Sequence, residues 1–374
     1  MKIVIAMDSF KGTLPADRAC GIVAETIVAD LPGAEIVVKP MADGGEGTAA
    51  ALMAASDGQW VPATVMGPLP EMEVRAGFAW LPGDRTAVVE MASASGMQLL
   101  RSDQLDPMRT TTFGTGRLIQ AALDHGADRI LLGVGGSATV DGGVGAAAAL
   151  GWRFLAGDGA PVPLGGGSLE GICEILPPRR DIEAPVDVLC DVDNPLCGPQ
   201  GAARVYGPQK GATPEMVETL DSGLSHLAAI VARRLAIHIR DLPGAGAAGG
   251  LAAGAVAFMG ARLGSGIETV MARAHLRSDV ADADWVITGE GRFDSQSMRG
   301  KVVSGVSRIA REGGARVAVI AGRVDLPSRL WRDLGIEVAL ACTPADVDLQ
   351  AACERCEQRL SETVRRFVAE HLRG

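Results

Sequence analysis

Short apolar runs of strand length, most of them followed by a loop of glycine and charged residues, are the feature that most constrains the fold of this chain. Five runs lie in two groups, one near each end of the chain, at residues 2–7, 35–39, 284–288, 316–321 and 336–341. Helical patterns accompany them, at residues 15–30, 48–56, 300–312 and 347–372. Short apolar strands that alternate with helices are typical of a parallel sheet covered on both faces. We therefore expect an α/β fold in which both ends of the chain build one doubly wound parallel sheet.

The region between the two groups predicts a second α/β domain. Residues 60–100 alternate like antiparallel strands, and residues 110–151 read as helix, strand, glycine loop and helix. A further strand ends in the segment CDVDNP, and a helix is predicted at 214–237. A chain of 374 residues is also longer than one ordinary hydrophobic core supports. We expect two domains, one from residues 1–64 and 285–374 and one inserted at 65–284, with the active site in the cleft between them.

Charge and hydropathy exclude several classes of partner. The net charge of −10 argues against nucleic acid or an anionic membrane as the main partner, because both require a positive surface. The N-terminal apolar run stops at Asp8, too early for a signal peptide, and the longest apolar stretch, 247–261, is shorter than the roughly 18–20 residues of a membrane span. The seven scattered cysteines fit reduced thiols. We expect a cytoplasmic protein, monomeric or homodimeric, that acts on small molecules.

Two loops near the N-terminus follow predicted strands. The segment DSFKGT carries Asp8, Ser9 and Lys11, and the segment ADGGEGT carries Asp43 and Glu46. Ligands of open parallel sheets bind at the carboxyl ends of the strands, and helix N-termini there attract anions. The side chains of both loops can therefore share one crevice. The alternative is a surface lysine beside a glycine turn with solvated acids.

The segment GVGGSATVDGGVG, residues 133–145, also follows a strand and precedes an Ala-rich helix. Its glycines let backbone amides approach a phosphate, its Ser and Thr supply hydroxyl donors, and its Asp suits a metal or a sugar hydroxyl. The nucleotide-binding candidates here are Gly135, Gly136, Ser137, Thr139 and Asp141. The pattern GxGxxA from Gly133 leaves open a nicotinamide-dependent hydroxyacid dehydrogenase, but the ribose-binding acid that this class requires has no good candidate downstream.

Three later segments complete the set of candidate loops. In CDVDNP, Asp191 and Asp193 lie two residues apart and offer the oxygen ligands that Mg²⁺ prefers. The segment YGPQKGAT presents Lys210. The segment GEGRFDSQSMRGK follows another apolar run and carries Glu290, Arg292, Asp294, Gln296 and Lys301. Each of these segments, taken singly, is equally compatible with a solvated loop.

The joint pattern favours phosphoryl transfer. Carboxylates, hydroxyls and lysines gather in glycine-bearing loops at strand ends, whereas the five histidines all lie elsewhere. Transfer of a phosphoryl group depends mainly on positioning, Mg²⁺ and charge neutralisation, which such groups supply. The chain lacks the GxxxxGK[ST] motif, so it is not a P-loop kinase. A sensor that binds the substrate or a nucleotide without catalysis would keep these loops but lose the metal-binding acids, which are present here.

Eight segments, in order along nearly the whole chain, resemble those of the bacterial type I glycerate kinases. They are DSFKG, PMADGGEGT, TTTFGTG, GVGGSATVDGG, CDVDNPLCG, GPQKGA, PGAGAAGGL and GEGRFDSQS with a following GK. The resemblance implies a flavodoxin-like domain interrupted by a second α/β domain. It also implies phosphorylation of D-glycerate with ATP and Mg²⁺ in glyoxylate and glucarate metabolism, usually to 2-phosphoglycerate, with 3-phosphoglycerate as the alternative. Phe113 and Val140 depart from the family, which usually has Tyr and Asn there.

The resemblance leads to a hypothesis for the role of each candidate. Lys11 and the helix start at Thr13 hold the carboxylate of glycerate, and ATP phosphates lie on the amides of residues 135–139. Asp191 and Asp193 hold Mg²⁺, and either Asp43 or Asp191 accepts the proton of the attacking hydroxyl. Substrate binding is further assigned to Asp8, Ser9, Glu46, Arg292, Asp294 and Gln296, and charge neutralisation to Lys210 and Lys301.

Overall fold

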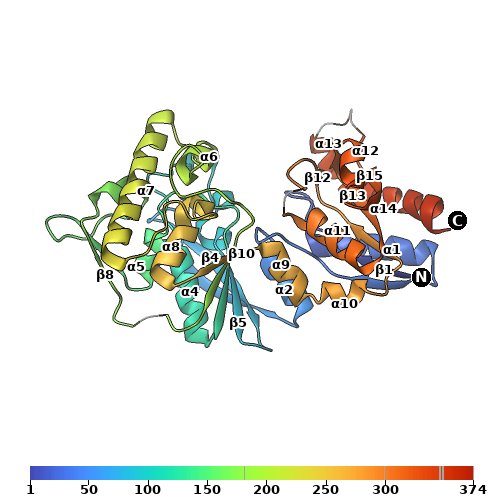
Figure 1. The fold of residues 1–374 in the computed structure, drawn as a ribbon, viewed down its shortest axis with the longest axis horizontal. Helices are drawn as coiled ribbons and strands as arrows, with labels where there is room; N and C mark the ends of the chain where they lie inside the picture. The colour runs from blue at the N-terminus through green and yellow to red at the C-terminus, as the bar shows by residue number, and fades with distance from the viewer. Residues whose placement is uncertain (181, 299, 345–346, 348, 374) are drawn as a thin grey trace. The chain divides into compact units, whose positions relative to one another are not determined.

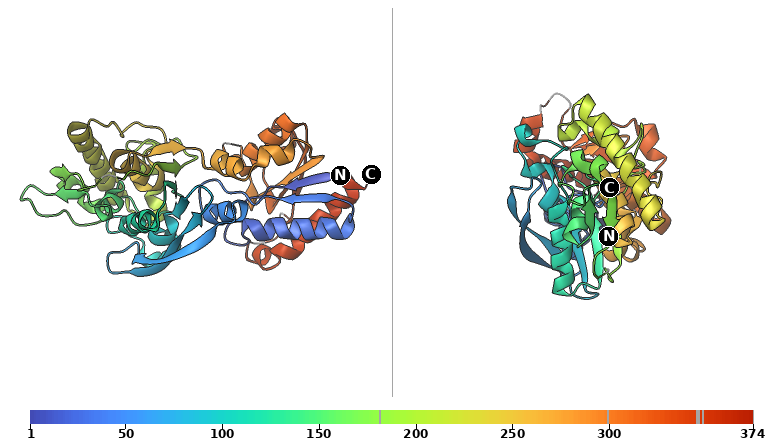
Figure 2. Two further views of the ribbon diagram at one scale, coloured as in Figure 1. Left: turned by 90° about the horizontal axis from the view of Figure 1, so that it is seen from below. Right: turned by 90° about the vertical axis from the view of Figure 1, so that its left-hand side faces the viewer.

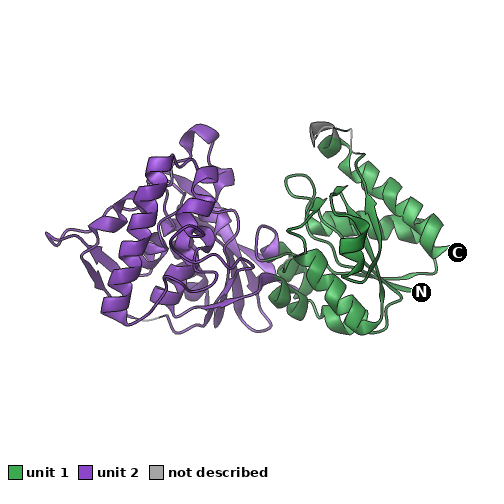
Figure 3. Ribbon diagram, turned by 45° about the horizontal axis from the view of Figure 1, so that its top comes forward, with its two compact units in different colours: residues 1–43, 50–56, 267–374 green, residues 44–49, 57–266 purple. Residues whose placement is uncertain are grey.

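The computed structural model describes residues 1–180, 182–298, 300–344, 347 and 349–373. The chain divides into two compact units, coloured separately in Figure 3. Unit 1 comprises residues 1–43, 50–56 and 267–374, and unit 2 comprises residues 44–49 and 57–266. The junctions therefore differ from the expected positions at 65 and 284. Strand β3 (Gln59–Met66) pairs along its whole length with its neighbour in unit 2, which moves the first junction toward the N-terminus.

Unit 1 is built on a five-stranded sheet in the order β15-β13-β11-β1-β2, and all neighbouring strands are parallel. Its strands are β1 (Lys2–Ile5), β2 (Glu35–Val38), β11 (Trp285–Thr288), β13 (Arg316–Ala321) and β15 (Ile336–Ala341). Renumbered within the unit, this is the order 2-1-3-4-5 of flavodoxin-like sheets. The predicted parallel sheet from both ends of the chain is confirmed, and Figure 1 shows it formed from the blue N-terminal and the orange to red C-terminal segments.

Helices cover both faces of this sheet. The helices of unit 1 are α1 (Ala16–Asp30), α2 (Thr48–Ala55), α9 (Gly266–Arg273), α10 (Leu276–Val280), α11 (Val302–Gly313), α12 (Ser328–Arg332), α13 (Leu349–Glu354) and α14 (Cys356–Phe367). The helix expected at 347–372 is thus divided into α13, α14 and a π-helical turn at Val368–Leu372. Two short strands of two residues each, β12 (Arg292–Phe293) and β14 (Arg323–Val324), form a small parallel pair separate from the main sheet.

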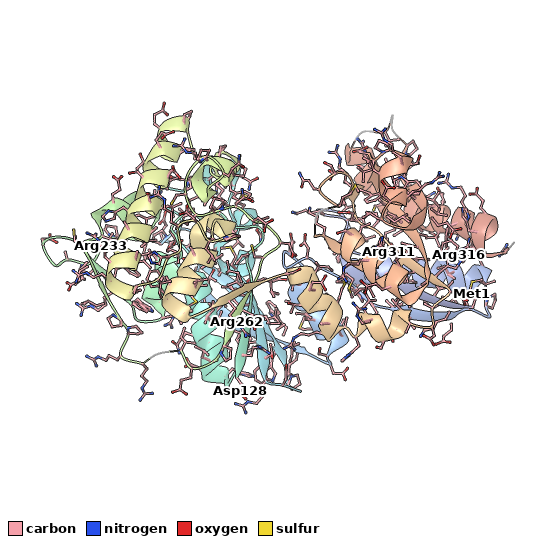
Figure 4. The ribbon with its side chains drawn as sticks, viewed as in Figure 1. Met1, Asp128, Arg233, Arg262, Arg311 and Arg316 are labelled. Atoms are coloured by element: carbon pink, nitrogen blue, oxygen red, sulfur yellow. The ribbon has the colours of Figure 1, made fainter. Side chains whose placement is uncertain are left out.

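The core of unit 1 joins residues from both ends of the chain. Helices α1 and α14 lie side by side (Figure 2) and pack their apolar faces on β1 and β11. Trp285 stacks edge-on against Phe367 at 5.1 Å between ring centroids, and the guanidinium of Arg316, labelled in Figure 4, lies 4.0 Å from the centroid of Trp285. The N-terminal strand therefore depends on C-terminal segments to cover its side chains.

Unit 2 contains a six-stranded mixed sheet in the order β10-β9-β6-β5-β4-β3. Besides β3 its strands are β4 (Glu73–Leu81), β5 (Thr86–Glu90), β6 (Arg129–Gly133), β9 (Val186–Leu189) and β10 (Arg262–Gly264). Strands β3, β4 and β5 are antiparallel, as the alternation in residues 60–100 predicts, whereas β5, β6, β9 and β10 are parallel. A separate two-stranded antiparallel sheet pairs β7 (Arg153–Leu155) with β8 (Glu174–Leu176).

The helices of unit 2 are α3 (Ala92–Ser95), α4 (Phe113–His125), α5 (Val144–Ala149), α6 (Ala202–Tyr206), α7 (Pro214–Leu235) and α8 (Leu251–Met259), with 3₁₀ turns between them. The longest, α7, begins where the Thr213 side chain accepts a hydrogen bond from the Met216 amide, 3.3 Å away. Across the part of the chain that the structure describes, no helix is both apolar enough and long enough to span a bilayer.

The Gly/Ala-rich stretch at 244–255 forms a 3₁₀ turn (Ala247–Gly250) that leads into α8, so it is a packed helix start rather than a linker. A Cβ on Gly249 would lie 1.9 Å from the carbonyl oxygen of Thr139, and one on Gly254 would lie 2.4 Å from that of Gly142. These two positions require glycine because α8 packs directly on the backbone of the loop at 133–143.

Candidate active site

Three carboxylates gather at the carboxyl ends of the strands in unit 1. Asp8 follows β1, Asp43 follows β2 and Glu290 follows β11. Because β1 and β11 are the strands where the order of the sheet reverses, their loops flank the position at which ligands bind in open α/β sheets. The loops are joined by the amide of Asp8, which donates to the carbonyl of Gly289 at 2.9 Å. The topology of unit 1 thus brings together acids that are distant in sequence.

Two of these carboxyl groups have pKa values close to neutral pH. Burial and the charge of Asp43 together raise the pKa of Asp8 to about 7, against a hydrogen bond from the Ser9 amide at 2.7 Å. Burial likewise raises the pKa of Glu290 to about 7, helped by the charges of Asp294 and Asp43. The positive charge of Lys301, at the start of α11, opposes the rise and lowers the pKa of both groups. Carboxyl groups with such pKa values can exchange protons near physiological pH, and they cluster at functional sites.

The remaining candidates in unit 1 divide between exposed and bonded side chains. Lys11 is exposed on a turn whose backbone packs beside Gly291, and Gln296 is also exposed. Arg292 is bonded to Asp325, with 2.6 Å between Nε and Oδ2. Asp294 accepts a hydrogen bond from the Gln296 amide at 2.8 Å, so it stabilises its own turn. Lys11 is consequently better placed than Arg292 to meet a substrate anion.

The loop at 42–48 belongs to unit 2 from Gly44 onward and is held there by tight backbone contacts. Gly44 has φ +89°, and a Cβ there would lie 2.9 Å from the carbonyl oxygen of Leu189. A Cβ on Gly135 would lie 2.6 Å from Cα of Gly45. These glycines therefore allow the loop to pack between the ends of β6 and β9. This close packing explains why the segment contains more glycine than a simple turn requires.

Glu90, at the end of β5, is a residue that the sequence analysis missed. Its carboxylate accepts a hydrogen bond from the Ala49 amide at 2.8 Å, and the amides of Gly47 and Thr48 also bond to it. Burial raises its pKa, and the charge of Glu46 adds to that effect, whereas the amides oppose it. Glu90 thus anchors the loop that carries Glu46 to the sheet. The signal in the sequence was an acid directly after the apolar run TAVV.

Asp141 ties the glycine loop to the TTT segment before α4. Its carboxylate accepts hydrogen bonds from the Thr112 amide at 2.7 Å, from the Thr112 hydroxyl at 2.9 Å and from the Gly143 amide at 3.1 Å. Burial raises its pKa, and these hydrogen bonds oppose the shift. The neighbouring Val140 is fully buried in the apolar core. Asp141 therefore supports the loop, and a contact of its carboxylate with the nucleotide stays a prediction.

Lys210 is buried rather than extended into solvent. Only 1% of its surface is exposed, and Nζ lies 2.6 Å from Oγ of Ser137 and 2.7 Å from the carbonyl oxygen of Thr139. Burial lowers the pKa of Lys210 to about 7, against the opposing charge of Asp141. The side chain of Thr139 is fully buried, and its Oγ1 has no hydrogen-bond partner among the described residues. The amine therefore acts on the glycine loop itself.

Asp191 and Asp193 lie in the loop after β9, and their exposure differs. Asp193 is exposed, whereas Asp191 is partly buried and accepts a hydrogen bond from the Gly266 amide at 3.2 Å. Within the described residues, no three His, Cys, Asp or Glu side chains are arranged to hold a metal ion. Mg²⁺ needs only one or two protein carboxylates when phosphate oxygens and water complete its coordination. The donor chemistry of this aspartate pair fits that requirement.

The comparisons with known proteins cover nearly the whole chain. The model of the glycerate kinase family matches residues 3–372. Glycerate kinase from Bacillus subtilis (strain 168) is 44% identical over 374 residues, covering 99% of this chain and 97% of that protein. The chain belongs to the glycerate kinase family.

Further members and a solved structure are similar to it. Glycerate 2-kinase from Escherichia coli (strain K12) is 45% identical over 326 residues, covering 86% of this chain and 85% of that protein. A crystal structure assigned to glycerate kinase 2 from Salmonella typhimurium LT2 has a TM-score of 0.86 and 41% identity, and the match covers 99% of this chain and 97% of that one. The resemblance to glycerate kinases found in the sequence motifs is thereby confirmed, as is the α/β fold class.

Proposed function

We propose that this glycerate kinase family member phosphorylates D-glycerate with ATP and Mg²⁺ and that the product is 2-phosphoglycerate. The observation that carries the proposal is the full-length family match, together with a carboxylate cluster at the switch point of a flavodoxin-like sheet. The relative from Escherichia coli is named glycerate 2-kinase, which supports the 2-position over the 3-position.

In unit 1 the groups suited to glycerate are Lys11 and the carboxylate cluster. The exposed amine of Lys11 supplies a positive charge for the carboxylate of the substrate. The attacking hydroxyl must lose its proton, and we assign Asp43 as the acceptor, with Asp191 of unit 2 as the alternative. The charge of Asp43 acts on both Asp8 and Glu290, and their raised pKa values let them hold a proton near neutral pH. Such a cluster can take up a proton as charge develops on the hydroxyl oxygen.

In unit 2 the groups that we assign to ATP are the aspartates after β9 and the amides of residues 135–139, except that of Ala138, which donates to the carbonyl of Ser95 at 2.9 Å. Gly136 has φ +71°, a conformation that turns successive amides of the loop toward one side. Asp191 and Asp193 would hold Mg²⁺, which when bound neutralises charge on the phosphates. Lys301 of unit 1 is the further cation that we assign to charge neutralisation. Replacement of the residue that accepts the proton of the attacking hydroxyl, Asp43 or Asp191, should lower the rate by about 10²-fold or more.

A coupled assay tests the proposal and its regiochemistry. The protein is supplied with ATP, Mg²⁺ and D-glycerate, and enolase reports 2-phosphoglycerate by the formation of phosphoenolpyruvate. Signal with enolase alone supports the 2-position. Signal only after phosphoglycerate mutase is added identifies 3-phosphoglycerate. If no ADP forms under any of these conditions, the kinase proposal is wrong.

A further inference from the structure

The pair formed by Ser137 and Lys210 has the geometry of a nucleophile and its base. The amine lies 2.6 Å from the hydroxyl oxygen, and 6% of Ser137 and 1% of Lys210 are exposed. In serine nucleophiles activated by lysine, the base must lie within about 2.6–3.2 Å of the hydroxyl and must itself be oriented by a third group. Here the third group is the carbonyl of Thr139, which accepts a hydrogen bond from the amine at 2.7 Å.

The surroundings of the amine favour its neutral form. Its two hydrogen-bond partners are a hydroxyl and a carbonyl, so neither is a carboxylate that would stabilise a full positive charge. Burial lowers the pKa of Lys210 to about 7 even though Asp141 is near enough to oppose the shift. A neutral amine has a lone pair that can accept the proton of Ser137, whereas a charged amine does not.

The backbone around Lys210 fixes where the amine can reach. Lys210 ends a 3₁₀ turn (Pro208–Lys210), and its amide bonds to the carbonyl of Gly207 at 2.9 Å. Gly211, which follows, has φ +94°, and a Cβ there would lie 2.5 Å from the carbonyl oxygen of Leu105. The turn is therefore packed closely against a neighbouring segment. A side chain fixed in this way suits a base with one permanent partner better than a mobile cation that follows a ligand.

We propose that Ser137 is a nucleophile activated by Lys210 and that it carries the phosphoryl group from the nucleoside triphosphate to the acceptor alcohol. The inference rests on the proposed kinase function and specifies its route. Oγ of Ser137 forms a bond to the γ-phosphorus, and the bond from that phosphorus to the β,γ-bridging oxygen breaks, so the electron pair leaves with the diphosphate. The proton of Ser137 passes to Nζ of Lys210.

The second step returns both residues to their starting state. The hydroxyl oxygen of the acceptor forms a bond to the phosphorus of phosphoserine, and the bond between that phosphorus and Oγ of Ser137 breaks. Lys210 returns its proton to Ser137, and the proton of the acceptor hydroxyl passes to a carboxylate and then to water. Each step inverts the configuration at phosphorus, so two steps retain it. Direct transfer, with Ser137 and Lys210 only positioning the loop, inverts it once.

The test is the configuration of the transferred phosphoryl group. ATP made chiral at the γ-phosphorus with oxygen isotopes is turned over by the wild-type enzyme with D-glycerate, and the product is analysed by ³¹P nuclear magnetic resonance. In parallel, the enzyme is incubated with γ-labelled ATP without acceptor, quenched in acid and digested for mass spectrometry. Retention together with a phosphoryl group on Ser137 supports the proposal. Inversion, or a label on any other residue, overturns it. Absence of turnover by the wild type in this assay would instead indicate failure of the kinase function.

Variants separate nucleophile and base from positioning. Ser137→Ala is expected to lower kcat by about 10³-fold or more, as removal of a nucleophile does in other enzymes, and Lys210→Met to abolish the phosphoserine. Lys210→Arg keeps a cation and two donors but cannot take up a proton, so it should also be inactive. Turnover by Lys210→Arg or Ser137→Ala within tenfold of wild type would refute the assignment. Circular dichroism and thermal melting confirm folding, and Ser102→Ala, at an exposed serine of the same unit, is the matched control.

Discussion

Replacement of Asp8 by Asn should stabilise unit 1, and the gain should increase with pH. The reason is the burial of this carboxyl beside Asp43 and Glu290, which raises its pKa to about 7 from an ordinary value of 3.8. Between these two values the folded chain holds a proton on Asp8 that the unfolded chain has released. Stability therefore falls as the pH rises from about 4 to about 7 and is constant with respect to this group above that range. The Asn variant lacks this loss.

The magnitude follows from the difference between the two pKa values. Each tenfold change in proton affinity corresponds to about 1.4 kcal/mol, so the full penalty above pH 8 is about 4 kcal/mol and that at pH 5 is about 1.7 kcal/mol. The advantage of Asp8→Asn over wild type should thus grow by about 2–3 kcal/mol between pH 5 and pH 8. Because Asp8 is also assigned to substrate binding, the same variant should lose activity while it gains stability.

Urea denaturation at several pH values, followed by tryptophan fluorescence, measures this difference, since Trp285 is in the core of unit 1. Asp333→Asn serves as the control, because Asp333 is an exposed aspartate of the same unit and its replacement should change stability by less than about 0.5 kcal/mol at every pH. A stability difference for Asp8→Asn that is constant with pH, or that shrinks as the pH rises, would refute the argument that Asp8 is protonated in the folded chain.

Substitutions at four further positions test other contacts. Glu90→Ala should lower kcat/KM by about 10–100-fold, because the 44–49 loop loses the carboxylate that anchors it, and Glu90→Gln should lower kcat/KM less. Steady-state kinetics of both variants test this prediction, and equal losses of kcat/KM in the two variants would contradict it. Gly44→Ala should destabilise the protein by about 1–3 kcal/mol, because φ is +89° and the new Cβ would lie 2.9 Å from the carbonyl oxygen of Leu189; an unchanged melting temperature would contradict it. Asp141→Ala should lower the free energy of unfolding by about 3–5 kcal/mol, because it leaves buried hydrogen-bond donors unpaired. Asp141→Asn should lower it less, and urea denaturation of both variants measures the difference. Asp43→Asn should lower kcat by about 10²-fold or more, and turnover within a few-fold of wild type would remove it from the role of base.

The sequence predicted the sheet of unit 1 well because its strands are short apolar runs with few competing interpretations. Strands at 316–321 and 336–341 are found with the expected bounds. The junctions between the units were less predictable, because most residues of β3 are exposed or only partly buried and only its pairing with β4 assigns it to unit 2. The pairing of strands decides where one unit ends and the other begins, and the local amino-acid composition does not show which strands pair.

Glycine and charge identified the candidate loops in the sequence, but they could not give the burial and hydrogen bonding of each side chain. Lys210 was expected as a cation for the transferred group, and the structure buries it against Ser137. The nucleotide role of Asp141 stays a prediction, but the sequence did not indicate that its carboxylate accepts a hydrogen bond from the Thr112 amide. Glu90 was missed because a lone acid at the end of a strand carries no spacing pattern. These outcomes depend on packing between segments that are distant along the chain.

The split composition of unit 1 has a consequence for synthesis. Strand β1 lies between β2 and β11, so its second neighbour is made only after the ribosome has translated all of unit 2. Until then the apolar residues of β1 and α1 lack the α14 face that covers them. Unit 2, apart from its short 44–49 segment, is continuous and can fold as it emerges, whereas the N-terminal strands must wait, exposed to aggregation and to chaperones, for the last third of the polypeptide.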